Sequence, residues 1–199
     1  MLKRSFFQRD PLTCARELIG CELRWGDAAG IIVETEAYDS EGDEASHTFF
    51  RPSTRAFVQA HPEGTAYVYL NYGIHWMFNV LVKGSRQGFV LIRALEPTKG
   101  MEKMFALRKV ERLEQLCSGP GKLARALDIT GAHHGVDLCR DPRFAFHPAK
   151  GEREIIAGPR IGISRAVDLP WRFVEAENPH LSVPLRKKTR PARINPDRS

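Results

Sequence analysis

The sequence predicts an α+β fold: a single mixed domain in which a curved, largely antiparallel sheet carries flanking helices and a protruding β-hairpin. Three observations support this prediction. The chain has 199 residues, which suits one domain, and 42% of them are hydrophobic, which is enough for a core. Several short β-branched and aromatic runs predict strands, two of them joined by a tight Tyr-Gly turn. Capped or amphipathic stretches beside these strands predict helices.

The first half of the chain predicts one helix and three strands. A helix is expected over residues 10–20, which open with Asp-Pro and close with Gly. Residues 30–38, GIIVETEAY, predict a strand. Alternate residues of a strand share a face, and here these are Ile32, Glu34, Glu36 and Tyr38. Residues 39–64 are rich in Gly, Pro, Ser and His and predict a loop, whereas residues 65–82 predict two strands around a turn.

The second half alternates strands and helices. Residues 88–97, GFVLIRALEP, predict a strand that ends at its proline. Residues 101–116 carry apolar side chains at helical spacing, and residues 118–129 predict a second helix. Late strands are expected over residues 160–167 and 171–177.

Most of the net charge of +6 lies at the end of the chain. Residues 186–199 contain six Lys/Arg and one Asp, a net charge of +5, so the other 185 residues carry only +1 (6 minus 5). We therefore divide the chain into a domain over residues 1–185 and a basic, flexible tail over residues 186–199. The tail is either a solvated terminus or a loose contact with phosphates, and net charge does not decide between these interpretations.

No feature of the sequence indicates a membrane or a metal. The opening residues turn polar too early for a signal segment, and no apolar run approaches the ~20 residues of a membrane span. We expect a cytoplasmic protein, associated with the nucleoid if it is bacterial. A zinc site was considered for one group of side chains, namely Cys117, His133, His134 and Cys139. Their spacing matches no familiar zinc pattern, so buried or inert thiols are the preferred interpretation.

The tyrosines are concentrated in one short part of the chain. All four, Tyr38, Tyr67, Tyr69 and Tyr72, fall within 35 residues of one another. Aromatic side chains often fill cores, and this interpretation suffices for Tyr67. Tyr72 is expected at a hairpin tip, where a core role is harder to accept. An aromatic ring at such a tip suits insertion into a base stack.

Two charged residues on predicted strands require an explanation. Glu36 lies beside an aromatic residue, and Arg93 is flanked by apolar ones. Glu36 is either a general base or one half of a structural ion pair with Arg93, and the residues alone leave both possibilities open. His47 is a candidate ligand, base or satisfied loop residue. Lys122, at the start of a Gly-rich helix, is a candidate phosphate contact.

Several motifs together resemble the alkyladenine (3-methyladenine) DNA glycosylase family. They occur in the expected order and are ARELIG, IVETEAYDSEGDEASH, GTAYVYLNYGIHWMFNV, LIRALEP, LCSGPGKLARAL and RIGI. The similarity extends in blocks over about residues 5–175. It implies a bacterial-type, monofunctional enzyme without a long N-terminal extension. Such an enzyme flips damaged purines out of duplex DNA and hydrolyses the N-glycosidic bond in base excision repair.

The resemblance also assigns roles to individual residues. Glu36 would activate the attacking water, and Arg93 and the backbone carbonyl of Ile163 would position it. The damaged base would be enclosed by residues of one pocket, namely Tyr38, Ala45, His47, Tyr69 and Asn79, of which Asn79 would reject guanine. Tyr72 would fill the gap left in the duplex. The DNA backbone contacts are expected from Tyr67, Thr54, Arg55 and Lys122.

The expected partner is double-stranded DNA with alkylated purines; whether deaminated purines are also substrates stays open. We expect a monomer that needs no cofactor and no metal. The alternative is a non-catalytic module that binds damaged DNA. Two further hypotheses are a bifunctional enzyme with Lys122 as Schiff-base nucleophile and a Mg²⁺-dependent nuclease that uses the acidic loop after Tyr38.

Overall fold

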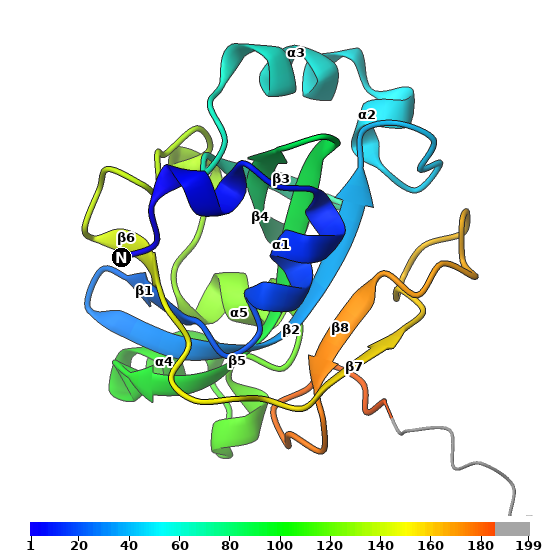
Figure 1. Ribbon diagram of the computed structural model, residues 1–199. Coiled ribbons are helices and arrows are strands. Elements are labelled where there is room, and N and C mark those ends of the chain that lie inside the picture. Colours follow the sequence, from blue (N-terminus) through cyan, green and yellow to red (C-terminus); the bar gives the residue numbers. More distant parts are fainter. Residues whose placement is uncertain (186–199) are drawn as a thin grey trace, which may run out of the picture.

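The computed structural model describes residues 1–185 and confirms the predicted fold class (Figure 1). The sheet strands are β1 (Glu22–Trp25), β2 (Ala28–Asp39), β3 (Ala66–Asn71), β4 (His75–Lys83), β5 (Gln87–Lys99), β6 (Phe144–His147), β7 (Ile155–Gly158) and β8 (Arg172–Glu175). The α-helices are α1 (Pro11–Glu17), α2 (His47–Phe50), α3 (Pro52–Ala60), α4 (Met101–Arg108) and α5 (Pro120–Ala126). Short 3-10 helices are η1 (Arg4–Phe7), η2 (Leu113–Gln115) and η3 (Gly131–His133). The basic tail predicted for residues 186–199 lies outside the described residues.

The sheet is antiparallel and is organised around β2. Its strand order is β3–β4–β5–β2–β1–β6. One edge of β2 pairs with β5, and the other edge pairs first with β1 and then with β8 at residues 34–36. β7 pairs with the outer edge of β8, and this pair lies beside the main sheet in Figure 1. Because both edges are hydrogen-bonded, residues 34–36 are held in a rigid part of the sheet.

A β-bulge in β2 changes which residues face the core. The register between β2 and β5 shifts between Ile32 and Glu34 and again between Glu34 and Thr35. Ile32 therefore belongs to the main core, whereas Val33 packs with Val174 in a separate cluster. The prediction that Ile32 shares a face with Glu34 was wrong, because a bulge inserts one residue and reverses the alternation. Glu34, Glu36 and Tyr38, beyond the bulge, do share a face, as their contacts below show.

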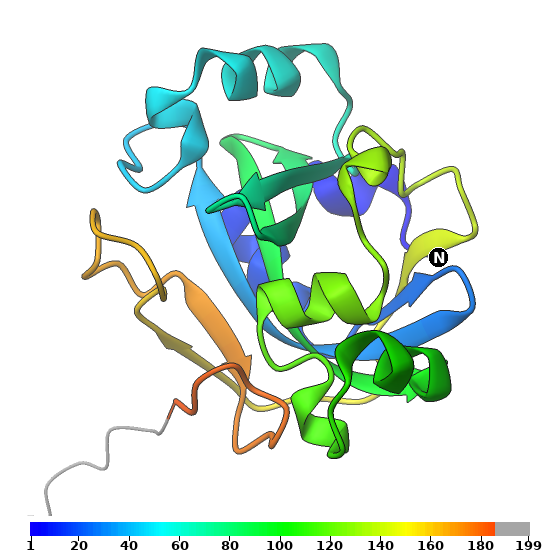
Figure 2. The same cartoon turned by 180° about the vertical axis from the view of Figure 1, so that it is seen from behind.

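Helices on different sides of the molecule contribute to one core. Figure 1 shows α1 nearest the viewer, and Figure 2, from behind, shows α5 in front. Leu18 after α1, Phe78 of β4 and Leu123 of α5 are fully buried in the main cluster. Phe78 also packs edge-on against Trp25, with ring centroids 5.0 Å apart. Burial of this apolar surface is the main stabilising contribution to the fold.

Residues 39–64 are not all loop, contrary to the prediction. They contain α2 and α3, which lie together at the top of both views. Pro52 occupies the first turn of α3, where its missing N–H is no disadvantage, and Phe57 and Val58 bury one face of the helix. The density of turn-forming residues masked this helical pattern.

Other element boundaries also differ from the predictions. β5 continues past Pro97 to Lys99. Opposite this end of β5, the register with β2 shifts between Ala29 and Gly30. The helix predicted over residues 101–116 ends at Arg108, because Lys109 adopts a left-handed conformation with φ 53°. Residues 160–167 form loop instead of a strand. Within residues 1–185, no helix combines the length and the apolar character needed to cross a membrane.

Candidate active site

A cavity of about 760 Å³ opens between β2–β5 and two loops. Its walls come from segments that are distant in the chain: the end of β2, residues 44–51, the β3–β4 hairpin and residues 161–165. Most residues predicted for the site line it, namely Tyr38, Ala45, His47, Tyr67, Tyr69, Tyr72, Asn79, Arg93 and Ile163. The structure therefore brings together residues that the sequence could only place on separate elements.

Aromatic rings form one wall of the cavity. The rings of His47 and Tyr69 lie 4.3 Å apart between centroids, and those of Tyr67 and Tyr69 lie 5.6 Å apart. The His47 Nδ1 atom is 3.1 Å from the Tyr67 hydroxyl. These contacts orient the rings around a space large enough for a flat heterocycle.

The ring side chains are neutral at pH 7. Burial, with a smaller contribution from the nearby Arg51 guanidinium, lowers the pKa of His47 to about 4. Burial raises the pKa of Tyr69 to about 12, and it also raises the pKa of Tyr38 well above its ordinary value. Neutral phenol faces are electron-rich, so the wall attracts a flat cation more strongly than a neutral ring.

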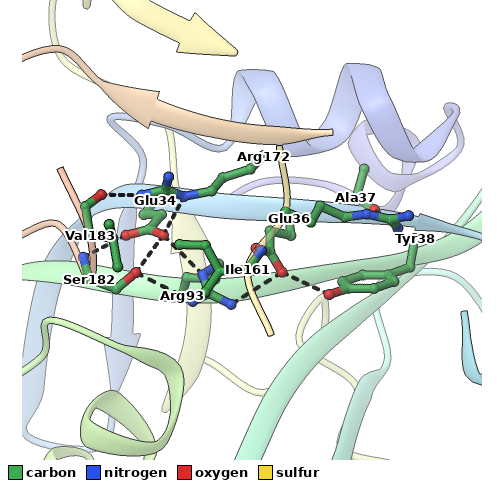
Figure 3. Close-up of polar contacts among 10 residues, drawn as sticks. Glu34, Glu36, Ala37, Tyr38, Arg93, Ile161, Arg172, Ser182 and Val183 are labelled. Carbon is green, nitrogen blue, oxygen red and sulfur yellow. Dashed lines mark hydrogen bonds and ion pairs between the residues drawn. The ribbon is translucent and has the colours of Figure 1, made fainter. Parts of the chain in front are cut away.

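Glu36 lies directly behind the cavity wall. Its side chain is fully buried, and three groups that line the cavity donate hydrogen bonds to it (Figure 3). The Ile161 amide donates to Oε1 at 2.7 Å, the Tyr38 hydroxyl to Oε2 at 2.7 Å, and Arg93 to Oε2 at 3.2 Å. A carboxylate has about four acceptor directions. One direction, on Oε1, is therefore left without a donor among the described residues.

A second carboxylate, Glu34, shares Arg93 with Glu36 (Figure 3). Burial by itself would raise the pKa of Glu34, but Arg93, Arg172 and hydrogen bonds from Ser182 outweigh burial and lower it. From the sequence, Arg93 was expected to pair with Glu36 alone, and Glu34 had no assigned role. The alternation in β2 was a signal for Glu34, whereas no sequence pattern connects it to Arg172 or Ser182.

Asp43 and Arg160 join two walls of the cavity through a fully buried ion pair at 2.6 Å. The Arg160 guanidinium also lies 4.6 Å from the centroid of the Tyr38 ring. Asp39 is likewise buried and pairs with Arg86, so two of the acidic residues that follow Tyr38 are buried and ion-paired.

The expected DNA-backbone residues are placed in two different ways. Thr54 and Tyr67 are buried, and their hydroxyls lie 2.9 Å apart. Tyr67 belongs to the aromatic wall and Thr54 supports it, and the phosphate contacts expected of both stay a prediction. Arg55 and Lys122 are exposed and bond to Thr48 and Ser118, respectively. Neither of these two lines the cavity.

Some cavity residues were not assigned roles from the sequence. Among them are Phe50, Arg51, Met77, Leu91, Ile161 and Arg165. Arg51 lies 5.5 Å from the Phe50 ring centroid and 6.0 Å from that of Tyr69. The Phe-Phe-Arg run at residues 49–51 was the available signal. Asn79 donates to the Tyr67 carbonyl at 3.1 Å, which fixes its amide at the cavity wall.

The described part of the chain contains no group of three or more His, Cys, Asp or Glu side chains arranged to hold a metal ion. Two members of the zinc hypothesis are cysteines, Cys117 and Cys139. Burial raises the pKa of Cys117 to about 12 and that of Cys139 to about 11, so both are thiols at neutral pH.

Comparisons with known proteins agree on one family. Residues 5–179 match the family model described as methylpurine-DNA glycosylase. A relative from Rhodopseudomonas palustris (strain HaA2) is 48% identical, over 93% of this chain and 92% of its own length. A relative from Agrobacterium fabrum is 51% identical, over 85% of this chain and 86% of its own length. A relative from Nitrosospira multiformis is 43% identical, over 91% of this chain and 93% of its own length. All three carry the name "Putative 3-methyladenine DNA glycosylase".

Proposed function

The chain belongs to the methylpurine-DNA glycosylase family, and from this premise we propose that it flips alkylated purines into the cavity and hydrolyses their N-glycosidic bond with a water activated by Glu36. As a member of this family it is an N-glycosyl hydrolase of the DNA-3-methyladenine type, which removes alkylated purines in base excision repair. All residues of the proposed site come from one chain, so we propose that it acts as a monomer.

Recognition of the base relies on the neutral aromatic wall. An N3- or N7-alkylated purine is a flat cation, which the faces of Tyr38 and Tyr69 attract. The cationic base also leaves without being protonated. A neutral base such as hypoxanthine would need an acid, and His47, with its lowered pKa, holds no spare proton at pH 7. We therefore propose that cationic lesions are released faster than neutral ones. Rejection of normal guanine is a separate proposal: Asn79, at the cavity wall, crowds its amino group.

Base flipping needs a replacement for the lost stacking. Extrusion of a nucleotide costs a few kcal/mol, roughly, and an inserted ring offsets part of this cost. Tyr72 lines the cavity at the tip of the β3–β4 hairpin and is 85% exposed. In our proposal it occupies the gap in the duplex while the base lies in the cavity. Arg55 and Lys122, exposed on the surface, contact DNA phosphates.

The chemical step uses the unoccupied acceptor direction of Glu36. Cleavage of a glycosidic bond passes through an oxocarbenium-like state, which a nearby carboxylate stabilises. A water that donates to Glu36, held by Arg93 and the Ile163 carbonyl, attacks C1′ as the base departs with the bonding electrons. The proton of that water passes to Glu36. The observation that carries this proposal is a buried carboxylate whose three hydrogen-bond donors all line the cavity.

The test is Glu36→Gln in a base-release assay with chelator present, on duplexes containing 7-methylguanine or hypoxanthine. The parent should release the methylated base and do so faster than hypoxanthine. The variant should bind the methylated duplex with similar affinity but excise about 10²–10⁴-fold more slowly, the usual range for loss of a general base.

An unchanged rate in Glu36→Gln would refute the assignment of Glu36. Binding by the parent without any base release would instead indicate a damage-binding module. A borohydride-trapped adduct on abasic DNA would indicate Schiff-base chemistry, and loss of activity in chelator would indicate a metal-dependent reaction.

A further inference from the structure

Glu36 belongs to a buried charge array of two carboxylates and two guanidiniums, namely Glu34, Glu36, Arg93 and Arg172. Two of these members, Glu34 and Arg172, have no part in the chemistry described above. The four residues are between 0% and 6% exposed. A balanced array of this kind can be purely structural, or it can set the position of the one member that reacts.

Glu34 does not line the cavity, and its carboxylate is held by four hydrogen bonds. Its Oε1 accepts from Arg93 Nε at 2.9 Å, from Arg172 Nε at 2.8 Å and from the Ser182 hydroxyl at 2.7 Å. Its Oε2 accepts from the Ser182 amide at 2.7 Å. These four bonds, from Arg93, Arg172 and Ser182, hold both oxygens of the carboxylate in place. Glu34 is therefore a fixed anchor (Figure 3).

The anchor controls how Arg93 meets Glu36. Arginine has a planar fork of N–H groups that tends to bind both oxygens of one carboxylate. Here Glu34 holds Nε and Ser182 lies 3.4 Å from NH2, so only NH1 reaches Glu36, and only its Oε2. The Oε1 atom of Glu36 thereby keeps the acceptor direction proposed for water. Without Glu34, the guanidinium is free to turn and engage both oxygens.

The segment after β8 completes this anchor. Ser182 supplies two of the four bonds to Glu34, and the Val183 carbonyl accepts a hydrogen bond from Arg172. Leu181 packs beneath them with Val33 and Val174. The family model matches residues 5–179 only, so Ser182 lies outside the matched part of the chain.

We propose that Glu34 is a positioning residue for the reaction: it holds Arg93 so that Glu36 keeps one oxygen free for water, and Ser182 fixes Glu34 in place. This inference depends on the proposed function. It differs from a structural role because loss of Glu34 should slow the chemical step in correctly folded protein that still binds DNA.

The test combines Glu34→Gln, Ser182→Ala and the double variant Glu34→Gln/Arg172→Gln. The double variant restores charge balance without restoring the anchor. The matched control is Glu175→Gln. Glu175 lies on the same strand as Arg172, and its part-buried carboxylate pairs with Arg153 at 2.5 Å. Each variant is assayed for single-turnover release of 7-methylguanine, for the Kd of a duplex with an uncleavable abasic analogue, and for Tm.

We expect Glu34→Gln to slow release about 10- to 100-fold, the effect of a misplaced catalytic group, with Kd within about twofold of the parent. Ser182→Ala should slow release about two- to tenfold, because it removes the hydroxyl bond to Glu34 and the longer contact with Arg93 but keeps the amide bond to Glu34. The double variant should regain Tm relative to Glu34→Gln but remain slow. Glu175→Gln should release the base at about the parent rate.

Equal rates in the parent and in folded Glu34→Gln would overturn the inference and leave the proposed function intact. Recovery of both Tm and rate in the double variant would also overturn it, because charge balance alone would then explain the array. If Glu34→Gln does not fold, Ser182→Ala decides, and a parental rate in that variant overturns the inference. A parent that releases no base would overturn the proposed function and this inference together.

Discussion

At the scale of single residues, burial sets the charge of the groups beside the cavity. His47 is held between Tyr69 and Phe50, and desolvation lowers its pKa from 6.5 to about 4. A protonated His47 would repel a cationic purine, so a neutral ring suits the proposed substrate. The same burial makes the stability of the protein depend on pH.

The first prediction concerns acidification and the variant His47→Gln. In the unfolded chain His47 binds a proton near pH 6.5, whereas in the folded protein it does so only near pH 4. The unfolded state therefore binds more protons between these values, and the free energy of unfolding should fall as pH decreases from 6.5 towards 4. Urea unfolding at several pH values should show that the free energy of unfolding falls less steeply with acidification in His47→Gln than in the parent.

An exchange of the exposed His75 for Gln is the matched control for that experiment. Parallel pH profiles for the parent and His47→Gln would contradict the prediction. Glu34 acts in the same direction but at lower pH. Its pKa is lowered below 4.5, so its contribution to the free energy of unfolding is complete above pH 4.5. That contribution is lost only on further acidification.

At the scale of elements, the β3–β4 hairpin combines an exposed ring with a strained turn. Tyr72 and Gly73 both have positive φ, 49° and 71°, and the Ile74 amide bonds to the Asn71 carbonyl at 3.1 Å. Two central residues with positive φ indicate a type I′ turn, which favours Asn-Gly. Tyrosine is unfavourable at the first position, and such strain is concentrated at functional sites. The placement of Tyr72 therefore supports its proposed insertion into DNA.

The variant Tyr72→Asn separates local stability from function. Asparagine fits the left-handed position better, so the free energy of unfolding should rise, by up to about 1 kcal/mol. Loss of the ring should slow excision from duplex DNA about tenfold or more, since one base–aromatic stack contributes roughly 1–3 kcal/mol. Urea unfolding and single-turnover excision measure the two effects.

Two comparisons make this prediction specific. Leu113→Ala removes another exposed apolar side chain, on η2, and should leave excision unchanged. Excision from single-stranded DNA should be affected less than excision from duplex DNA, because no opposing stack has to be replaced. A Tyr72→Asn variant that excises from duplex DNA at the parent rate would exclude insertion of Tyr72.

At the scale of the whole molecule, the cavity depends on contacts between distant segments. Asp43 and Arg160 are 117 residues apart in sequence, and their buried pair joins the loop after β2 to the loop that carries Ile161. Arg160 also donates to the Ala37 carbonyl at 3.0 Å, next to Glu36. This one guanidinium therefore connects β2, the loop after β2 and the loop that carries Ile161.

Asp43→Asn should therefore destabilise the fold strongly. Removal of one partner leaves a buried guanidinium without its counter-charge, which typically costs about 3–5 kcal/mol. The matched change Glu22→Gln breaks the exposed pair with Arg24, and such pairs contribute about 0–1 kcal/mol. Urea unfolding of both variants tests the contrast. A similarly small loss of unfolding free energy in both would show that the buried Asp43–Arg160 pair stabilises the fold no more than the exposed pair does.

Local sequence patterns determined much of the fold. The Asp-Pro start of α1, the strand patterns of β2 and β5 and the turn at Tyr72-Gly73 act over a few residues, so the sequence displays them directly. The motif resemblance identified the family, and most of the site residues that it singled out line the cavity. The pattern failed where local signals conflicted, as in α3, or where a bulge reversed the alternation, as at Ile32.

Only the tertiary structure decided how charges are shared around Glu36. Ser182 bonds to Glu34 across 148 residues of sequence, and Ile161 bonds to Glu36 across 125. No local periodicity encodes such pairs, because each residue is compatible with many partners until the sheet and loops bring them together. Burial then makes each pairing obligatory, since an unpaired charge in the interior is costly. The sequence thus determined which groups are present at the site, and folding determined how those groups are paired.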